Sequence, residues 1–372
     1  MRGEGLPVLV AAFLVVLVPG GGAGAAAGET VRVGTPPAVL AAQSGERLGG
    51  DFARAEVPVA TAPAGERGAV AASWLAEAFA PADAPACREV LAALHLPAAG
   101  PAPGVLAAAW PADRPAAEDG VRGRLLVPAK LPPLSPPDLE VFRLVGLVPF
   151  EIAATGEWAR AVAFRHLGPP PADPLLRAAR AARAEGTCRL AGILVTVTGA
   201  GLAGDDAGRA LPELDRDGAG WPRERLRRLG LDPLRRALAE TCLRDGLRWA
   251  AWAWLRGGWR GLAAALERPG IGPAELLVPA RRGRTVAGKG ETCRLGPRAS
   301  GLLLVGDPDA PLVDRLLEDH WSALPGGRRL RATLRVEEGA VPDLLGGLPD
   351  GARVLSVRGS EVTVEVPARP LR

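Results

Sequence analysis

The chain has no tyrosine, one methionine, three histidines and four cysteines among its 372 residues. Lys130 and Lys289 are its only lysines, so nearly all of its positive charge comes from arginine. So little histidine argues against a serine-hydrolase triad, and neither a G-x-S-x-G sequence nor a Walker phosphate loop occurs. After the N-terminal segment, no run reaches the roughly 18 apolar residues that a membrane-spanning helix needs.

The overall composition is typical of a globular protein, with 48% hydrophobic and 23% charged residues. The net charge is +4 and the isoelectric point is near 9.3. Arginine blocks such as Arg223–Arg228 and Arg281–Arg284 are interpreted as solvated faces. We therefore expect no nucleic-acid partner.

Residues 1–27 are typical of a signal peptide. Arg2 precedes the apolar run Leu6–Val18, which ends at Pro19 and a series of glycines, and Ala25–Ala27 offers a cleavage site. The apolar run is too short to span a bilayer. We expect a secreted or periplasmic protein with no other membrane segment. An uncleaved anchor is the alternative, because Glu4 offsets the single basic residue Arg2.

The four cysteines suit an exported protein, where an even number is typical of disulfides. Cys87, Cys188, Cys242 and Cys293 allow three pairings, and the absence of a C-x-x-C sequence argues against a zinc site. We expect Cys188 to pair with Cys242, because both lie in predicted helices of one core. Cys87 would then pair with Cys293.

Local patterns predict a mixture of helices and short strands. Pro at the first helical position after Ser or Asp predicts helix starts at Ser135, Asp173 and Asp232. Pro149 predicts either a new helix from about Val148 or a kink, and the buried run 190–197 fits helix or strand. The other predicted helices are 69–80, 86–94 and 311–324, and the predicted strands are 30–33, 56–60, 121–129, 302–305, 330–336, 353–357 and 361–366.

One of these helices carries the segment Phe150-Glu151-Ile152-Ala153-Ala154, and a later helix carries Glu185. Residues four apart lie on one face of a helix, so Phe150 and Ala154 are neighbours. The segment resembles the HExxH helix of zinc peptidases of the gluzincin type, with both zinc-binding histidines replaced. The resemblance implies that Phe150 and Ala154 stand at lost ligand positions, Glu151 at a vestigial general-base position and Glu185 at a vestigial ligand position.

Further segments extend this resemblance to a group of secreted bacterial zincin-like proteins over about residues 50–285. They are Cys87–Pro97, Arg124–Ala129, Ala184–Gly186, Arg256–Trp259 and Pro273–Leu277. The implied fold class is α+β: a helix-rich zincin-like domain over 28–289 with a short N-terminal sheet, then a small α+β domain over 290–372. In such a fold the strand before the active helix, here 121–129, is the edge along which substrate lies.

Two classes of function follow from the resemblance. The first is an exported pseudo-peptidase without a cofactor, which binds a peptide or protein in a cleft remodelled by Phe150, or acts as a scaffold. The second is a hydrolase that works outside the cytoplasm at a different site, or a metallopeptidase with unrecognised ligands. A catalytic zinc needs three protein ligands, and only Glu185 remains in the expected place. The sequence leaves the oligomeric state open.

Overall fold

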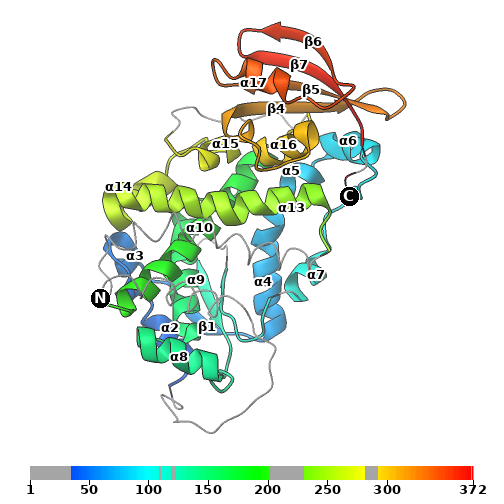
Figure 1. Ribbon diagram of the computed structural model, residues 1–372. Coiled ribbons are helices and arrows are strands. Elements are labelled where there is room, and N and C mark those ends of the chain that lie inside the picture. Colours follow the sequence, from blue (N-terminus) through cyan, green and yellow to red (C-terminus); the bar gives the residue numbers. More distant parts are fainter. Residues whose placement is uncertain are drawn as a thin grey trace.

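The protein is described here from a computed structural model that places residues 35–108, 110–118, 123–201, 230–280, 292–369 and 371. It has the expected α+β class, with a helical body and two small sheets (Figure 1). The predicted signal peptide and the predicted strand 30–33 lie outside the described residues. Within these ranges no helix is both long enough and apolar enough to cross a membrane.

Helices and single helical turns make up most of the described chain. In order they are α2 (Pro37–Ala42), η1 (Gly45–Arg47), α3 (Gly50–Arg54), α4 (Ala64–Glu77), α5 (Ala80–Asp83), η2 (Pro85–Cys87), α6 (Arg88–Ala93), α7 (Pro103–Ala108), α8 (Pro136–Val145), α9 (Pro149–Leu167), α10 (Pro174–Gly199), α13 (Pro233–Glu240), η3 (Thr241–Asp245), α14 (Gly246–Leu266), α15 (Pro273–Leu277), α16 (Pro297–Val305), η4 (Val313–Arg315) and α17 (Val341–Gly346).

The strands form two separate sheets. The first, in the order β1-β3-β2, contains β1 (Val59–Thr61), β2 (Ala116–Glu118) and β3 (Arg124–Val127). The second, in the order β4-β5-β7-β6, is antiparallel throughout and contains β4 (Leu316–Ala323), β5 (Arg329–Val336), β6 (Arg353–Arg358) and β7 (Glu361–Pro367).

The predicted helix starts are confirmed by their caps. Ser135 and Asp138 form a reciprocal capping box at α8. Asp173 accepts hydrogen bonds from the backbone amides of Leu175 and Leu176 at α10. Pro149 is the first residue of α9, so it begins a helix and does not kink one. Asp232 caps α13 in the same way, through the amide of Arg235.

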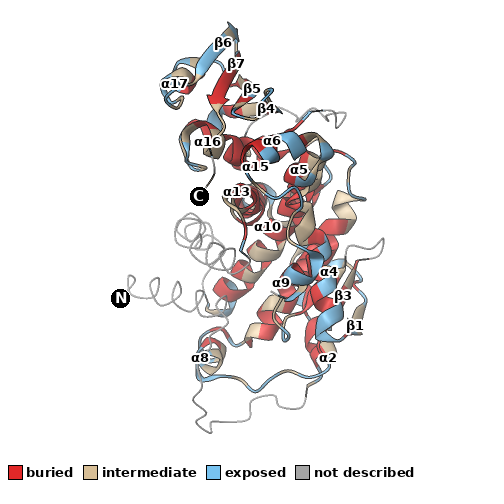
Figure 2. Cartoon of the chain, turned by 90° about the vertical axis from the view of Figure 1, so that its right-hand side faces the viewer, coloured by how far each residue is buried: buried red, intermediate tan, exposed pale blue. Residues whose placement is uncertain are grey.

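Helix α10 is the central element of the body. Buried residues occur along most of its length, including the run 190–197, which is helical (Figure 2). It packs against both α9 and α14. At Gly186 its backbone touches that of Gly246 on α14: a β-carbon added to Gly186 would lie 1.9 Å from the Gly246 carbonyl oxygen. Only glycine permits two helices to approach so closely.

The tryptophans of α14 belong to the core of the body. Trp249 is buried, while Trp252, Trp254 and Trp259 are partly buried against the same core. The helix is interrupted at Gly257 and Gly258, whose backbone angles are not helical.

The C-terminal region from residue 290 does not have a core of its own. Its buried side chains from α16 and the four-stranded sheet pack with Val90 and Leu91 of α6 and with Leu234 and Leu238 of α13. The predicted boundary at residue 290 thus cuts through one continuous hydrophobic cluster. The sheet is fixed to the body, and segments far apart in sequence meet beneath it (Figure 1).

Two elements of this region differ from the prediction. Residues 302–305 were expected as a strand but end the helix α16, which Pro297 begins and Gly306 closes with a left-handed backbone (φ 77°). The predicted helix 311–324 is largely the strand β4. Leu316, Asp319 and Trp321 face the interior, and a register shift between Leu316 and Glu318 interrupts the strict alternation that marks a strand in the sequence.

The strand before α9 is not a free edge. β3 lies between β1, which pairs with it in parallel, and β2, which pairs with it antiparallel. The expectation that this strand offers an edge to a substrate is therefore wrong. The short strand β2 comes from a segment that the sequence analysis did not assign, and it occupies the place where an extended peptide would pair.

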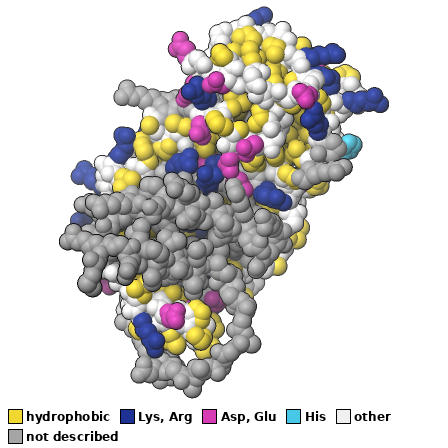
Figure 3. Space-filling model, viewed as in Figure 1, with side chains coloured by type: hydrophobic (Ala, Val, Ile, Leu, Met, Phe, Trp, Pro, Cys, Tyr) yellow, Lys and Arg dark blue, Asp and Glu magenta, His cyan; other side chains and the backbone are white. Residues whose placement is uncertain are grey.

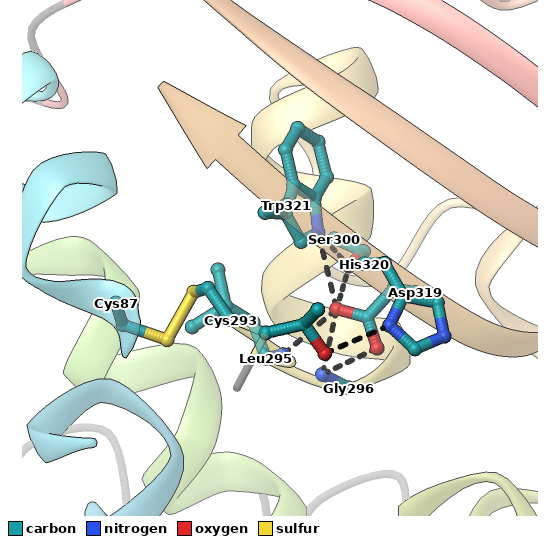
Figure 4. Close-up of a disulfide and its surroundings, with 9 residues drawn as sticks. Cys87, Cys293, Leu295, Gly296, Ser300, Asp319, His320 and Trp321 are labelled. Atoms are coloured by element: carbon teal, nitrogen blue, oxygen red, sulfur yellow. Dashed lines mark hydrogen bonds between the residues drawn. A yellow bond between two sulfur atoms is a disulfide. The ribbon is translucent and has the colours of Figure 1, made fainter. Parts of the chain in front are cut away.

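One of the two predicted disulfides is present. Cys87, at the end of η2, is bonded to Cys293, 206 residues later, and both are buried (Figure 4). Just after Cys293, the amides of Leu295 and Gly296 donate to the buried carboxylate of Asp319 on β4. The disulfide and this carboxylate together fasten the loop before α16 to both α6 and β4.

The other predicted disulfide, between Cys188 and Cys242, is wrong, because both residues are free thiols. Cys188 faces α9, where its sulfur lies 3.5 Å from an oxygen of Glu157. Cys242 lies in η3, a π-helical turn between α13 and α14. Cys242 is part of the main hydrophobic core, whereas Cys188 is only partly buried and does not belong to it.

We expect thiol titration of the denatured, unreduced chain to find two thiols per molecule, from Cys188 and Cys242. Reduction before titration should expose the other two cysteines, Cys87 and Cys293. In the folded protein Cys242 should react slowly, because burial keeps the reagent away and raises the pKa of its thiol. A denatured, unreduced chain without free thiols would contradict this assignment.

Candidate functional site

Glu151 occupies the first turn of α9 and has a helix-capping role. One carboxylate oxygen accepts the backbone amide of Val148 at 3.0 Å, and the other lies 2.6 Å from a guanidinium nitrogen of Arg47. The side chain is fully buried. A carboxylate at this position also interacts favourably with the positive end of the helix dipole.

Glu185 lies in the middle of α10 and binds a different arginine. Its Oε2 atom is 2.6 Å from Nη2 of Arg160 on α9. Glu151 and Arg160 are nine residues apart on α9, which corresponds to about 13 Å along the helix axis. The structure therefore does not bring Glu151 and Glu185 to one site, although the sequence analysis placed them in one.

Phe150 and Ala154, the two positions at which the resemblance places lost ligands, both lie in the main hydrophobic core. Phe150 is 8% exposed and Ala154 is fully buried. Neither side chain can donate an electron pair to a metal. Their face of α9 is packed against other apolar residues, so the cleft that was expected beside Phe150 is filled.

A buried ionic network lies further along α9 and is the strongest candidate site. Arg160 donates from Nε to Oε2 of Glu157 at 2.9 Å and from Nη2 to Glu185 on α10. Glu157 also accepts the amide of Ala117 in β2 at 3.0 Å. The ring of Trp74 on α4 covers the Arg160 guanidinium at 3.8 Å. Four elements thus enclose one cation between two carboxylates.

The charges in this network are strongly coupled. Burial by itself would lower the pKa of Arg160, but Cys188, Glu157 and Glu185 raise it well above its ordinary value. Burial, together with the two carboxylates, raises the pKa of the Cys188 thiol despite the nearby guanidinium. The Cys188 thiol is therefore neutral at pH 7 and carries no charge that could act on Arg160 there, so Glu157 and Glu185 are the groups that hold Arg160 in its charged form.

The network does not have the donors of a metal centre. No group of three or more His, Cys, Asp or Glu among the described residues is arranged to hold a metal ion. Arg160 occupies the point on which Glu157 and Glu185 converge, and a guanidinium has no lone pair to offer at physiological pH. Its Nη1 atom is buried without a hydrogen-bond partner in the described part of the chain.

The histidines and the buried Asp319 do not form a second catalytic group. Ser300 donates to Asp319 at 2.9 Å, whereas His320 contacts Thr292 and points away from Ser300 (Figure 4). His166 contacts Glu267, and His95 is exposed at the end of α6. Within the described residues no histidine contacts a serine or cysteine, so nothing there favours a hydrolase triad.

Sequence reasoning missed Glu157 and Arg160. The available signal was their spacing of three on one helix, which is also the commonest spacing of an exposed ion pair. Nothing in the sequence separates a buried pair from an exposed one in a chain so rich in arginine. The large apolar residues Trp158 and Phe164 on the same helix were a second signal, because apolar residues on several faces of a helix indicate that the whole helix is buried. Both are buried in the structure.

A scan against protein-family models, a search of curated proteins and a search of solved structures found no match to this chain.

Proposed function

We propose that the protein is an exported, non-catalytic relative of zinc peptidases, in which an arginine has replaced the metal and the body serves as a binding or scaffolding unit. One observation carries the proposal. Arg160 places a buried cation between a carboxylate of its own helix and Glu185 of the following helix. A zinc peptidase of the HExxH type would hold its zinc near such a carboxylate pair.

The proposal moves the comparison with HExxH by six residues, from Phe150–Ala154 to Gly156-Glu157-Trp158-Ala159-Arg160. In this alignment Gly156 and Arg160 stand at the histidine positions, Glu157 at the general-base position and Glu185 at the third ligand. It is supported because Glu157 and Glu185 meet at one cation. Glu151 and Glu185 do not meet in this way.

The residues now present do not fit zinc, so no zinc-dependent hydrolysis is proposed. Gly156 has no side chain, and a β-carbon there would lie 2.9 Å from the carbonyl oxygen of Cys188. Arg160 keeps its proton and repels a metal. Glu157, which would activate a water in an enzyme, is held by Arg160 and by the amide of Ala117.

Export is supported by two independent features. Residues 1–27 have the pattern of a signal peptide, and Cys87 and Cys293 form a disulfide, as is typical of proteins that fold in an oxidising compartment. A binding or scaffolding role is the one that remains for an exported protein whose ancestral site is closed by an ion pair. Its partner would be a peptide or protein.

The proposal is tested by Arg160→His, which should create a metal site. The new imidazole would join Glu157, Glu185 and the thiol of Cys188, which together are enough donors for a tetrahedral zinc. We expect zinc to raise the melting temperature of this variant, and cobalt to produce a thiolate charge-transfer band.

Arg160→Met is the matched control, because it removes the same charge but adds no ligand. Arg160→Met leaves Glu157, Glu185 and the Cys188 thiol in place, so it should respond to zinc less than Arg160→His, which has one ligand more. The wild type should not respond to zinc and should not cleave casein. Glu185→Gln added to Arg160→His should abolish the response. A folded Arg160→His variant that zinc stabilises no more than Arg160→Met would refute the alignment, and casein cleavage by the wild type would refute the non-catalytic role.

A further inference from the structure

The C-terminal sheet has one covered edge and one open edge. The covered edge is β4, where the amide of Trp321 donates to the carbonyl of Cys293 and the segment after Cys293 runs alongside. The open edge is β6, which is paired only with β7. No backbone group of 353–358 bonds to any described segment other than β7, so its outward amides and carbonyls are available to a partner.

The open edge is also unusually apolar. Val354, Leu355 and Val357 are 47%, 48% and 46% exposed, and they are three of the few large hydrophobic residues that the described surface exposes. β6 is mostly exposed beside the buried strand β7 (Figure 2). Hydrophobic side chains gather over this end of the molecule, with arginines around them (Figure 3).

The positive charge at the two ends of β6 determines which kind of strand can pair with this edge. β6 begins with Arg353 and ends with Arg358, both exposed and neither in an ion pair with a described residue. The strand has no acidic residue. Glu365, which lies opposite Arg353 in β7, is engaged by Arg331 at 2.9 Å. Glu361 lies opposite Arg358 in β7 but forms no ion pair with it among the described residues, so the guanidinium groups at both ends of the edge can still pair with an acidic partner.

A second copy of the chain is a poor partner for this edge. An antiparallel pair of β6 strands centred between Leu355 and Ser356 would set Arg353 of one copy opposite Arg358 of the other. Like charges directly opposite each other destabilise a sheet. The arginines and the irregular register between Val354 and Ser356 thus discourage self-association while leaving the edge open to acidic strands.

We infer that β6 binds an extended segment of another protein by strand addition, and that this segment has apolar residues in its middle and an acidic residue at each end. Backbone hydrogen bonds to the outer side of β6 would supply affinity, while Val354, Leu355, Val357 and the two arginines would select the sequence. This site lies in the C-terminal sheet, goes beyond the proposed function and does not depend on the Arg160 network.

The test uses a short fluorescein-labelled peptide that alternates valine and threonine between terminal aspartates, and a second peptide with terminal lysines. Fluorescence polarisation should show the aspartate peptide binding the wild type about ten-fold more tightly, with a preference that weakens as salt is added. The double variant Arg353→Gln, Arg358→Gln should lose this preference and keep the wild-type melting temperature.

Arg54→Gln with Arg143→Gln is the matched control, because both arginines are exposed on the helical body and the net charge falls equally. It should leave the preference intact. An equal loss in the control would attribute the binding to general positive charge and overturn the inference. Absence of any preference in the wild type would also overturn it, as would a dimer in sedimentation that Val357→Asn dissociates.

Discussion

Replacing Arg160 with methionine should lower the free energy of unfolding by about 3–5 kcal/mol at neutral pH, because removing one partner leaves the others charged and buried. Glu157 and Glu185 are each less than a tenth exposed, and both depend on the same guanidinium. Methionine keeps much of the apolar volume under Trp74, so the loss reports mainly on charge. Urea denaturation followed by circular dichroism measures it.

The same variant has an internal control. Adding Glu157→Gln and Glu185→Gln to Arg160→Met removes every charge of the network while keeping an oxygen that can accept the Ala117 amide. This triple variant should recover at least half of the lost stability, since neutral replacements of whole buried ion networks are often tolerated. A cost below about 1 kcal/mol for Arg160→Met alone would show that the network is not the desolvated cluster described here.

Gly186→Ala should be the most damaging glycine-to-alanine change among the described residues, with a loss of at least about 3 kcal/mol or failure to fold. The added methyl would meet the carbonyl group of Gly246 at 1.9 Å, and this neighbour is backbone, so a side-chain rotation cannot relieve the clash. Helices α10 and α14 would have to separate, and α10 would also lose its fit against α9. Melting temperature and soluble yield measure the effect.

Gly192→Ala is the matched control, since Gly192 lies on the same helix but has open space around it. Its nearest neighbour would be a methyl of Ile152 at 3.8 Å, an ordinary contact. Alanine should therefore stabilise the protein by about 0.5–1 kcal/mol through its higher helix propensity. If Gly186→Ala and Gly192→Ala had similar effects, the close approach of α10 and α14 would be disproved.

The sequence was sufficient for those features that neighbouring residues determine. Ser135, Asp173 and Asp232 each precede a proline, and this local pattern fixed three helix starts. The strands 353–357 and 361–366 were likewise predicted from local alternation and are β6 and β7. The pairing of Cys87 with Cys293 was also predicted, but from the premise that Cys188 pairs with Cys242. That premise was wrong, because Cys188 and Cys242 are free thiols.

Features that depend on distant residues could not be predicted. The burial of Asp319 in β4 is one such feature, because a carboxylate pointing into the core is unfavourable unless other segments supply donors. Those donors are the amides of Leu295 and Gly296, the hydroxyl of Ser300 and the indole of Trp321. For the same reason the sequence could not show that Arg160 faces the interior: its partner Glu185 lies on the next helix.

The span of the disulfide has a consequence for the order of folding. During synthesis Cys87 emerges first, and Cys188 and Cys242 both follow before Cys293. Because Cys293 lies 206 residues after Cys87, two incorrect partners become available to the Cys87 thiol before the correct one does. Helices α9, α10 and α14, which bury Cys188 and Cys242, lie between the two bonded cysteines in the chain. If these helices pack first, Cys188 and Cys242 are removed from reaction and only Cys87 remains for Cys293. Gly186 and Gly246, which let α10 and α14 pack closely, would then also help the correct disulfide to form.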